Sequence, residues 1–342
     1  MADLTPPQFT PVHLVTGFLG SGKTTLLQRL LADPALADTA VLINEFGEVG
    51  LDHHLLERID DTMVLLQSGC LCCTIRGELA VAIKDLHSRR ERGVVPAFRR
   101  LVVESTGLAD PLPILSTVQA DPVLRHHFRL GNVITTVDAV NGLGRPESLK
   151  QVAVADRLVL TKTDLAVAEQ TEALLDKIRR LNPSAPLWRA AEQPVDAEAL
   201  LHQDLFALAQ RSDWFAAEIA EHHGHGHDRN RHGDSIHAFA LSFEGELDWT
   251  MFGVWLTMLL NRHGEAVLRV KGILNVSGSP TPVAIHGVQQ LVHPPVHMAA
   301  WPDGDRRSRL VFIVDGLERS AIERSLVAFL RPARQARTTA VA

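Results

Sequence analysis

The stretch most informative about chemistry is residues 17–25, GFLGSGKTT, which satisfy the spacing G-x-x-x-x-G-K-[ST]. They follow the apolar run 12–15 and precede an apolar helical pattern at 26–31. In a strand–loop–helix context, successive backbone N–H groups and the helix N-terminus hold anionic phosphates. A simple glycine-rich turn would not need the Lys-Thr pair, so we expect Lys23 to reach the outer phosphates and Thr24 to bind Mg²⁺. The residues expected to hold the nucleotide here are Gly17, Gly20, Ser21, Gly22, Lys23, Thr24 and Thr25.

Residues 104–107, ESTG, follow the apolar run 101–103 and have the form of a second Mg²⁺ and γ-phosphate element. Glu104 would hold a water molecule of the Mg²⁺ shell, and the Gly107 N–H would contact the terminal phosphate. An acidic residue at the end of a strand is also common without this role. No glutamine stands out as the residue that orients the attacking water, and Glu45 is the leading candidate. The expected catalytic residues are therefore Lys23, Glu45 and Glu104.

Residues 161–164, TKTD, have the place and form of the guanine-reading loop [NT]-K-x-D. The Asp164 carboxylate can accept hydrogen bonds from guanine N1–H and the exocyclic amine, and Lys162 would lay its aliphatic stem over the base. Threonine at 161, where asparagine is usual, weakens the match because the asparagine amide commonly braces the phosphate loop. The alternative is that Asp164 is only the N-cap of the next helix. Beside a phosphate-binding loop, the motif favours guanine.

The three cysteines of the chain, Cys70, Cys72 and Cys73, lie within one tetrapeptide, CLCC. Thiolates are soft ligands that select Zn²⁺, Cu⁺ or, with oxygen or nitrogen partners, Co²⁺. Two or three ligands from one loop leave an open position for Glu45, a histidine or a partner that receives the metal. The alternatives are small buried cysteines and a redox sensor. The cluster predicts a transition-metal site that can pass its metal on.

Each of these polar motifs comes directly after an apolar run that is typical of a strand. The runs 40–43, 63–66 and 133–137 also end in polar residues, and segments with helical spacing separate the runs. Apolar strands that alternate with helices are typical of a parallel sheet covered on both faces. Such sheets bind ligands at the carboxyl ends of their strands. We therefore expect an α/β, P-loop NTPase domain with a mostly parallel sheet, on which the motifs converge.

The pattern changes after residue 220. Residues 1–220 are expected to form the nucleotide domain, 221–235 a histidine-rich linker, 236–331 a smaller α+β domain and 332–342 a flexible tail. The linker histidines either collect metal weakly or only solubilise the chain; they are His222, His223, His225, His227 and His232. The second domain holds three more among apolar residues, which we expect to be structural: His286, His293 and His297.

Composition narrows the class of protein. The chain has 342 residues, 46% of them hydrophobic, which is enough for a large and a smaller domain. Its net charge of −6 has no large single-sign block, which argues against nucleic acid as a partner. The apolar runs are shorter than a membrane span and the first residues lack a signal layout, so we expect a cytoplasmic protein. In a reducing compartment the cysteines would be thiols available to a metal.

The ordered set of motifs, GFLGSGKTT, NEFGEVG at 44–50, CLCC, ESTG and TKTD, resembles the CobW family of P-loop GTPases. That family includes zinc metallochaperones and helpers of cobalt insertion. The resemblance covers the first domain almost end to end, and LRVKGI at 268–273 looks like the family's carboxy-terminal domain. It implies GTP bound with Mg²⁺, a transition metal at the cysteine motif near Glu45, and slow GTP hydrolysis coupled to metal transfer to a metalloprotein client.

Two other classes of protein remain open from the sequence. One is a non-enzymatic metal buffer or sensor in which nucleotide only sets the conformation, and the other is an unrelated P-loop ATPase or kinase. The cysteine spacing does not separate Zn²⁺ from Co²⁺, because both accept tetrahedral sulfur and nitrogen sites.

Overall fold

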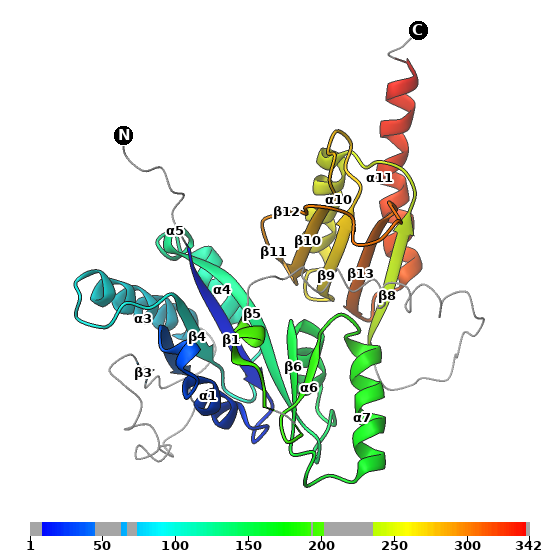
Figure 1. Ribbon diagram of the computed structural model, residues 1–342. Coiled ribbons are helices and arrows are strands. Elements are labelled where there is room, and N and C mark those ends of the chain that lie inside the picture. The colour runs from blue at the N-terminus through cyan, green and yellow to red at the C-terminus, as the bar shows by residue number, and fades with distance from the viewer. Residues whose placement is uncertain (1–8, 45–62, 67–73, 193, 202–234, 340–342) are drawn as a thin grey trace. The chain divides into compact units, whose positions relative to one another are not determined.

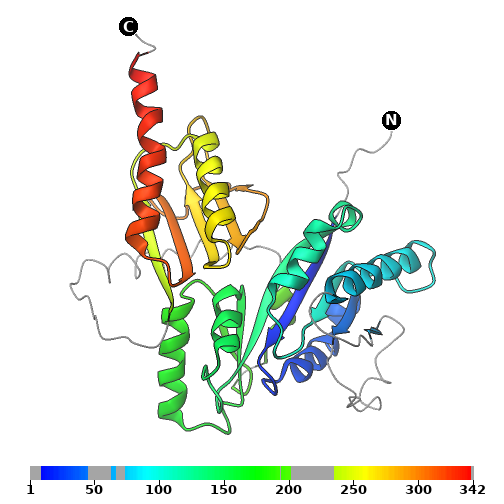
Figure 2. The ribbon, with the colours of Figure 1, turned by 180° about the vertical axis from the view of Figure 1, so that it is seen from behind.

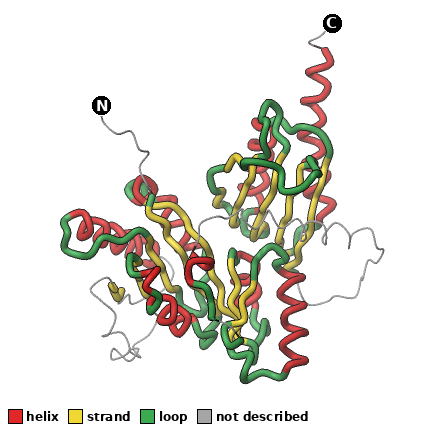
Figure 3. The backbone as a smooth tube through the Cα atoms, in the orientation of Figure 1, coloured by secondary structure: helices red, strands yellow, loops and turns green. Residues whose placement is uncertain are grey.

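The computed structural model describes residues 9–44, 63–66, 74–192, 194–201 and 235–339 (Figure 1). The chain divides into two compact units. The first carries a seven-stranded sheet, and the second carries a separate six-stranded sheet. In Figure 3 the strands of both sheets are drawn in yellow and the helices in red.

The sheet of the first unit is parallel at every strand pairing, in the order β3-β2-β4-β1-β5-β6-β7. Val12, Leu14 and Val15 of the central strand are all buried, because helices cover both faces of such a sheet. The parallel sheet expected from the apolar runs is confirmed. The strands are β1 (Thr10–Gly17), β2 (Thr39–Asn44), β3 (Met63–Leu66), β4 (Arg100–Glu104), β5 (Phe128–Asp138), β6 (Arg157–Thr161) and β7 (Leu187–Arg189).

Helices lie on both faces of this sheet (Figures 1 and 2). Ile134 of β5 belongs to one apolar cluster with α1, η1 and α8. The hydroxyl of Thr135, next along β5, donates to the Gln151 carbonyl of α6, so α6 covers the opposite face. The helices are α1 (Lys23–Leu31), η1 (Pro34–Leu36), α3 (Thr74–Glu91), α4 (Leu112–Ala120), α5 (Leu124–His127), α6 (Pro146–Val154), α7 (Ala168–Leu181) and α8 (Ala197–Leu201).

The carboxyl edge of the sheet is where the motifs meet. β1 runs between β4, which ends at Glu104, and β5, whose Thr136 lies opposite Gly17. β5 in turn places Asp138 opposite Thr161, the last residue of β6. Because all these strands run in the same direction, their ends face one edge of the sheet, the position at which open α/β sheets bind ligands.

The described residues of the second unit form an antiparallel sheet with two long helices. Its path is β11-β10-β9-β13-β8, and β12 pairs with β10. The strands are β8 (Ile236–Phe243), β9 (Val267–Leu274), β10 (Val283–Val288), β11 (Leu291–Val292), β12 (Val296–His297) and β13 (Ser308–Asp315). The helices are α10 (Trp249–His263) and α11 (Arg319–Thr339). The α+β class expected for this part of the chain is confirmed.

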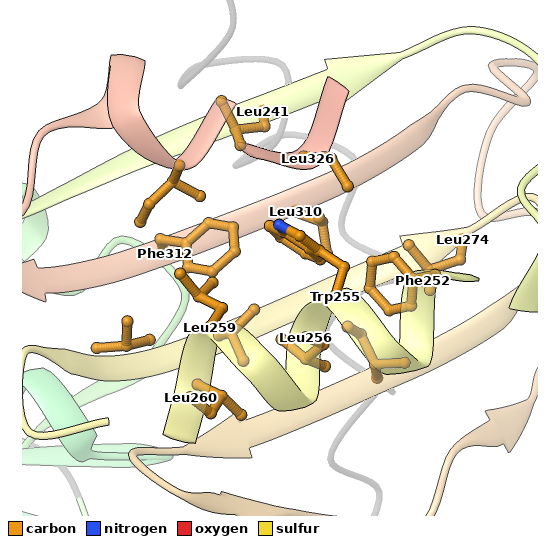
Figure 4. Packing of buried hydrophobic residues seen from close by; sticks show 14 of the residues in the cluster. Leu241, Phe252, Trp255, Leu256, Leu259, Leu260, Leu274, Leu310, Phe312 and Leu326 are labelled. Atoms are coloured by element: carbon orange, nitrogen blue, oxygen red, sulfur yellow. The ribbon is translucent and has the colours of Figure 1, made fainter. Parts of the chain in front are cut away.

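The core of the second unit lies between this sheet and its helices (Figure 4). Trp255 is buried at its centre, with its ring 5.6 Å from that of Phe252 and 6.4 Å from that of Phe312. The indole N–H donates to the Ser325 hydroxyl at 3.0 Å, so the polar atom of this large side chain is satisfied. An independent core of this kind is what a separately folding unit requires.

The closing helix is longer than expected. α11 continues past Leu330 to Thr339, into the segment 332–342 for which the sequence predicts a flexible tail. Residues 333–337 of this segment are ARQAR, and alanine, arginine and glutamine all favour helix. Among the described residues, no helix is both long enough and apolar enough to cross a bilayer.

His13 is a fully buried histidine in the middle of β1. Its Nδ1 accepts a hydrogen bond of 3.0 Å from the Asn132 N–H. Burial, assisted by the positive charge of Arg100 and opposed by Asp156, lowers the pKa of His13 from 6.5 to about 3. The ring is therefore neutral in the folded protein at physiological pH.

This shift predicts a loss of stability in acid. The unfolded chain binds a proton at His13 below pH 6.5 while the folded protein does not until about pH 3, so acid favours unfolding throughout that window. The contribution of neutral His13 to the free energy of unfolding is complete above pH 6.5. It falls by about 1.4 kcal/mol per pH unit below that, so that about 2 kcal/mol is lost at pH 5. Urea unfolding of wild type and His13→Gln at pH 7.5 and pH 5 measures it. An equal loss of stability in both proteins would contradict the prediction, and His237→Gln, which replaces an exposed histidine, is the control.

Candidate nucleotide-binding site

The loop at residues 17–25 has the backbone geometry of a phosphate cradle. Gly17 has φ +140°, and a Cβ there would lie 2.3 Å from Thr136 Oγ1, so only glycine fits. Gly20 and Gly22 also have positive φ, and α1 begins directly after Gly22. The N-terminus of α1 therefore opens at the loop, as anion binding requires.

Lys23 and Thr24 begin α1 and carry the two functional groups of the loop. The Lys23 ammonium donates to the Gly17 carbonyl at 3.0 Å and to the Phe18 carbonyl at 3.1 Å, and the side chain is only 8% exposed. These bonds hold the cation against the backbone of the loop, a place from which a lysine in this motif can reach bound phosphates. Thr25 follows in the first turn of α1 and is exposed.

Thr24 and Glu104 meet at the carboxyl edge of the sheet. The Thr24 hydroxyl donates to Glu104 Oε1 at 2.7 Å, and Glu104 is 4% exposed. A hydroxyl and a carboxylate are the hard oxygen ligands that Mg²⁺ prefers, so these two side chains fit a Mg²⁺ site beside the phosphates. The sequence predicts both residues, and the fold brings them together across 80 positions of the chain.

Buried hydroxyl groups connect the phosphate loop to β5, and the end of β1 to the segment that follows β4. Ser21 Oγ and Thr136 Oγ1 of β5 share a hydrogen bond of 2.6 Å. The Ser105 hydroxyl, just after β4, donates to Thr16 Oγ1 at 2.9 Å. Of these four residues, Ser21 is a predicted nucleotide-binding residue and Ser105 lies within the predicted ESTG element. Hydroxyl side chains in otherwise apolar strand ends were the available signal for Thr16 and Thr136.

Gly107 lies directly against the phosphate loop. A Cβ at this position would lie 2.4 Å from the Leu19 backbone nitrogen, so a side chain would displace one of the two segments. Leu19 and the next residue, Leu108, are both exposed. The glycine therefore permits the close approach that contact between its N–H and a terminal phosphate would need.

Thr161 supplies the bracing contact that was expected of an asparagine. Its hydroxyl donates to the Ser21 carbonyl of the phosphate loop at 2.8 Å. The substitution that weakens the sequence match therefore preserves the tie between the two loops, because a hydroxyl on β6 reaches the same segment. Asp164 is exposed in the turn after β6, four residues before α7 begins at Ala168, so it does not cap that helix.

Lys162 is held in place by Asp138, a residue that the sequence analysis did not single out. The two side chains form an ion pair of 2.6 Å, and Lys162 has φ +58°, uncommon for a residue with a side chain. Burial would raise the pKa of Asp138, but hydrogen bonds from Lys162, Asn141 and the Val140 backbone N–H lower it. The carboxylate therefore stays charged, and it anchors the ammonium while the lysine stem remains available to cover a base.

The predicted transition-metal ligands Glu45, Cys70, Cys72 and Cys73 lie outside the described residues, as do the linker histidines His222, His223, His225, His227 and His232. Their described neighbours lie at the edge already identified. Asn44 ends β2 and pairs with Leu66, which ends β3, and α3 begins at Thr74. Within the described part of the chain, no group of three or more His, Cys, Asp or Glu side chains could hold a metal ion.

The histidines of the second unit occupy two environments. The rings of His286 and His293 stack 4.4 Å apart, and both residues are buried. His297 is exposed in the short strand β12. The structural role expected of the first two agrees with their burial beside β10 and β11.

Both units match known protein families. Residues 11–189 match the CobW/HypB/UreG nucleotide-binding domain, and residues 236–330 match the C-terminal domain of the cobalamin synthesis protein CobW. The chain is 34% identical to the zinc chaperone YjiA of Escherichia coli (strain K12) over 310 residues, which cover 88% of this chain and 93% of that protein.

Two further relatives extend the comparison. The chain is 28% identical to the zinc-regulated GTPase metalloprotein activator 1 of Schizosaccharomyces pombe over 300 residues, which cover 78% of this chain and 72% of that protein. The crystal structure of Zn(II)-bound YjiA GTPase from E. coli superimposes with a TM-score of 0.69 at 28% identity, covering 94% of this chain and 99% of that chain.

Proposed function

This chain belongs to the CobW family, and we propose that it is a Mg²⁺-dependent GTPase that binds a transition metal and delivers it to a client metalloprotein. The observation that carries the proposal is the 2.7 Å contact between Thr24 and Glu104, beside a buried Lys23. It joins the phosphate loop to the end of β4, so that the two expected nucleotide elements meet at one pair of side chains.

The nucleotide in this proposal is GTP. Asp164 would accept hydrogen bonds from the guanine edge, and Lys162, anchored by Asp138, would cover the base. The hydrogen bond from Thr161 to Ser21 fixes the loop at 161–164 relative to the phosphate loop. Adenine has no donor pair to match the Asp164 carboxylate, so the motif distinguishes GTP from ATP.

Hydrolysis would use the groups at the carboxyl edge. Lys23 neutralises charge that develops on the outer phosphates, and the Gly107 N–H contacts the terminal phosphate. Thr24 and Glu104 would hold Mg²⁺, which supplies further charge stabilisation at the phosphates. Glu45 is the candidate for orienting the attacking water. Slow intrinsic turnover is expected, since Glu45 is at best a partial replacement for a dedicated glutamine.

The cargo in this proposal is Zn²⁺ or Co²⁺, bound by Cys70, Cys72, Cys73 and Glu45. The segments that carry these residues begin at Asn44 and Leu66, paired strand ends. β2 also pairs with β4, with Ile43 opposite Glu104, so both segments start near the Mg²⁺ ligand. The names of the zinc chaperone YjiA and the zinc-regulated GTPase activator favour Zn²⁺.

The test of this proposal is whether nucleotide changes metal affinity. GTP can alter the affinity for Zn²⁺ only by binding the metal-loaded and metal-free states differently. We expect Zn²⁺ affinity in the presence of Mg²⁺ and a non-hydrolysable GTP analogue to be about tenfold higher than with GDP. The measurement is a competition titration against a chromophoric Zn²⁺ chelator.

A Lys23→Ala variant under the same conditions is the control, because its Zn²⁺ affinity should no longer respond to the analogue. Equal affinities with GDP and the analogue in the wild type would refute the coupling. A metal-responsive protein that never releases phosphate from GTP would instead be a buffer or sensor.

A further inference from the structure

Gln151 is a buried amide that contacts the loop after Glu104. It lies on α6 and is 1% exposed. Its Nε2 donates to the Gly107 carbonyl at 3.1 Å and to the Ala109 carbonyl at 3.3 Å. One side chain thus fastens two carbonyls of the segment that would detect the terminal phosphate.

The orientation of this amide is determined by its neighbours. Gln151 Oε1 is buried and has no hydrogen-bond partner among the residues that the structure describes. A flipped amide would turn that oxygen toward two carbonyl oxygens, which offer no donor. The side chain therefore provides hydrogen bonds to two carbonyls of the loop, while its own carbonyl oxygen accepts none from the described residues. Buried acceptors without a partner are uncommon and call for an explanation.

The loop is held from two sides. On one side Gly107 lies against Leu19 of the phosphate loop, where no Cβ would fit. On the other side stands Gln151, whose helix is itself fixed to β5 by the hydrogen bond from Thr135 to the Gln151 carbonyl. The next residue of β5, Thr136, contacts Ser21 of the phosphate loop. Gln151 and the phosphate loop are therefore both hydrogen-bonded to β5.

We propose that Gln151 is a positioning residue for recognition of the terminal phosphate, an inference that rests on the proposed function. By fixing the carbonyls of Gly107 and Ala109 on either side of Leu108, it restrains the ψ angle of Gly107 and holds the backbone of that residue where its N–H can meet the terminal phosphate. A diphosphate does not reach that N–H, so Gln151 acts on the triphosphate alone. It thereby sets how strongly the protein prefers GTP over GDP.

The test is the ratio of two dissociation constants. Gln151→Met keeps the length of the side chain and removes the carbonyl and the NH2 of its amide. Gln151→Glu replaces the NH2 donor with a carboxylate oxygen, which only accepts. For each variant, affinity for GDP and for a non-hydrolysable GTP analogue is measured with Mg²⁺ by fluorescence titration, after thermal unfolding has verified that the variant folds. We expect about tenfold weaker analogue binding with GDP affinity within about twofold of wild type, and a larger effect for glutamate.

Ser148→Ala is the matched control, since Ser148 is buried on the same helix and lines the same small cavity as Gln151. It should leave both affinities unchanged. Equal weakening of GDP and the analogue in the Gln151 variants would show a merely structural role and overturn the inference, as would no change in either. A wild-type preference for ATP would refute the guanine assignment instead, while the triphosphate-to-diphosphate comparison at Gln151 could still be made with adenine nucleotides.

Discussion

Replacing Lys23 with alanine is expected to lower the rate of GTP hydrolysis by about 100-fold or more, because the phosphates lose the cation that neutralises their developing charge. Lys23 is 8% exposed and is held by the Gly17 and Phe18 carbonyls, and alanine leaves no charged group in that place. Phosphate release under saturating GTP and Mg²⁺ is the measurement.

A lysine outside the site provides the control for this loss. Lys84 of α3 forms an ion pair of 2.9 Å with Asp121 and lies outside the phosphate loop. Lys84→Ala should hydrolyse GTP within about twofold of wild type, since it removes only a partly exposed ion pair. If Lys23→Ala hydrolysed GTP as fast as Lys84→Ala, the phosphate loop would not be the catalytic site.

Cys72→Ala is expected to abolish most of the thiolate-to-metal charge-transfer absorption that Co²⁺ produces in the wild-type protein. Removing one thiolate from a set of three leaves too few soft ligands, and we expect Co²⁺ affinity to fall by about 100-fold or more. The measurement is an anaerobic titration of Co²⁺ in the presence of Mg²⁺ and GTP, followed by absorption spectroscopy.

The comparison variant for this titration is His237→Ala, which removes an exposed imidazole in β8. It should leave the spectrum unchanged, because its side chain is not among the proposed ligands. A Co²⁺ spectrum that survives in Cys72→Ala would mean that the metal binds elsewhere. A preference for ATP in the same protein would in addition refute the guanine assignment.

Much of the first unit could be predicted from residue pattern alone. Apolar runs such as 12–15 and 158–160 lie in β1 and β6, and the polar residues that follow them lie at one edge. This succeeds because a strand covered on both faces must be apolar throughout, which leaves a simple mark in the sequence. The extent of α11 was less predictable, since the helix continues to Thr339 through residues whose apolar pattern does not indicate a core-facing helix.

The contacts that hold the site could not be predicted in the same way. Thr161 looked like a departure from the usual asparagine until its hydroxyl was found 2.8 Å from the Ser21 carbonyl. Asp138 looked like an ordinary strand end, yet it anchors Lys162. Each contact joins residues more than 20 positions apart, so its existence depends on strand order and side-chain direction.

The sequence by itself determined the chemical groups that this chain offers: the lysine and threonine of a phosphate-loop motif, a carboxylate at 104, a T-K-T-D loop and three clustered thiols. It also determined the class of fold, because local spacing and hydrophobic periodicity encode both. Only the tertiary structure decided which side chains hold these groups in place: the hydroxyl of Thr161, the carboxylate of Asp138 and the amide of Gln151. Their roles arise from packing, which brings distant side chains within hydrogen-bond distance and excludes the water that would otherwise compete for them.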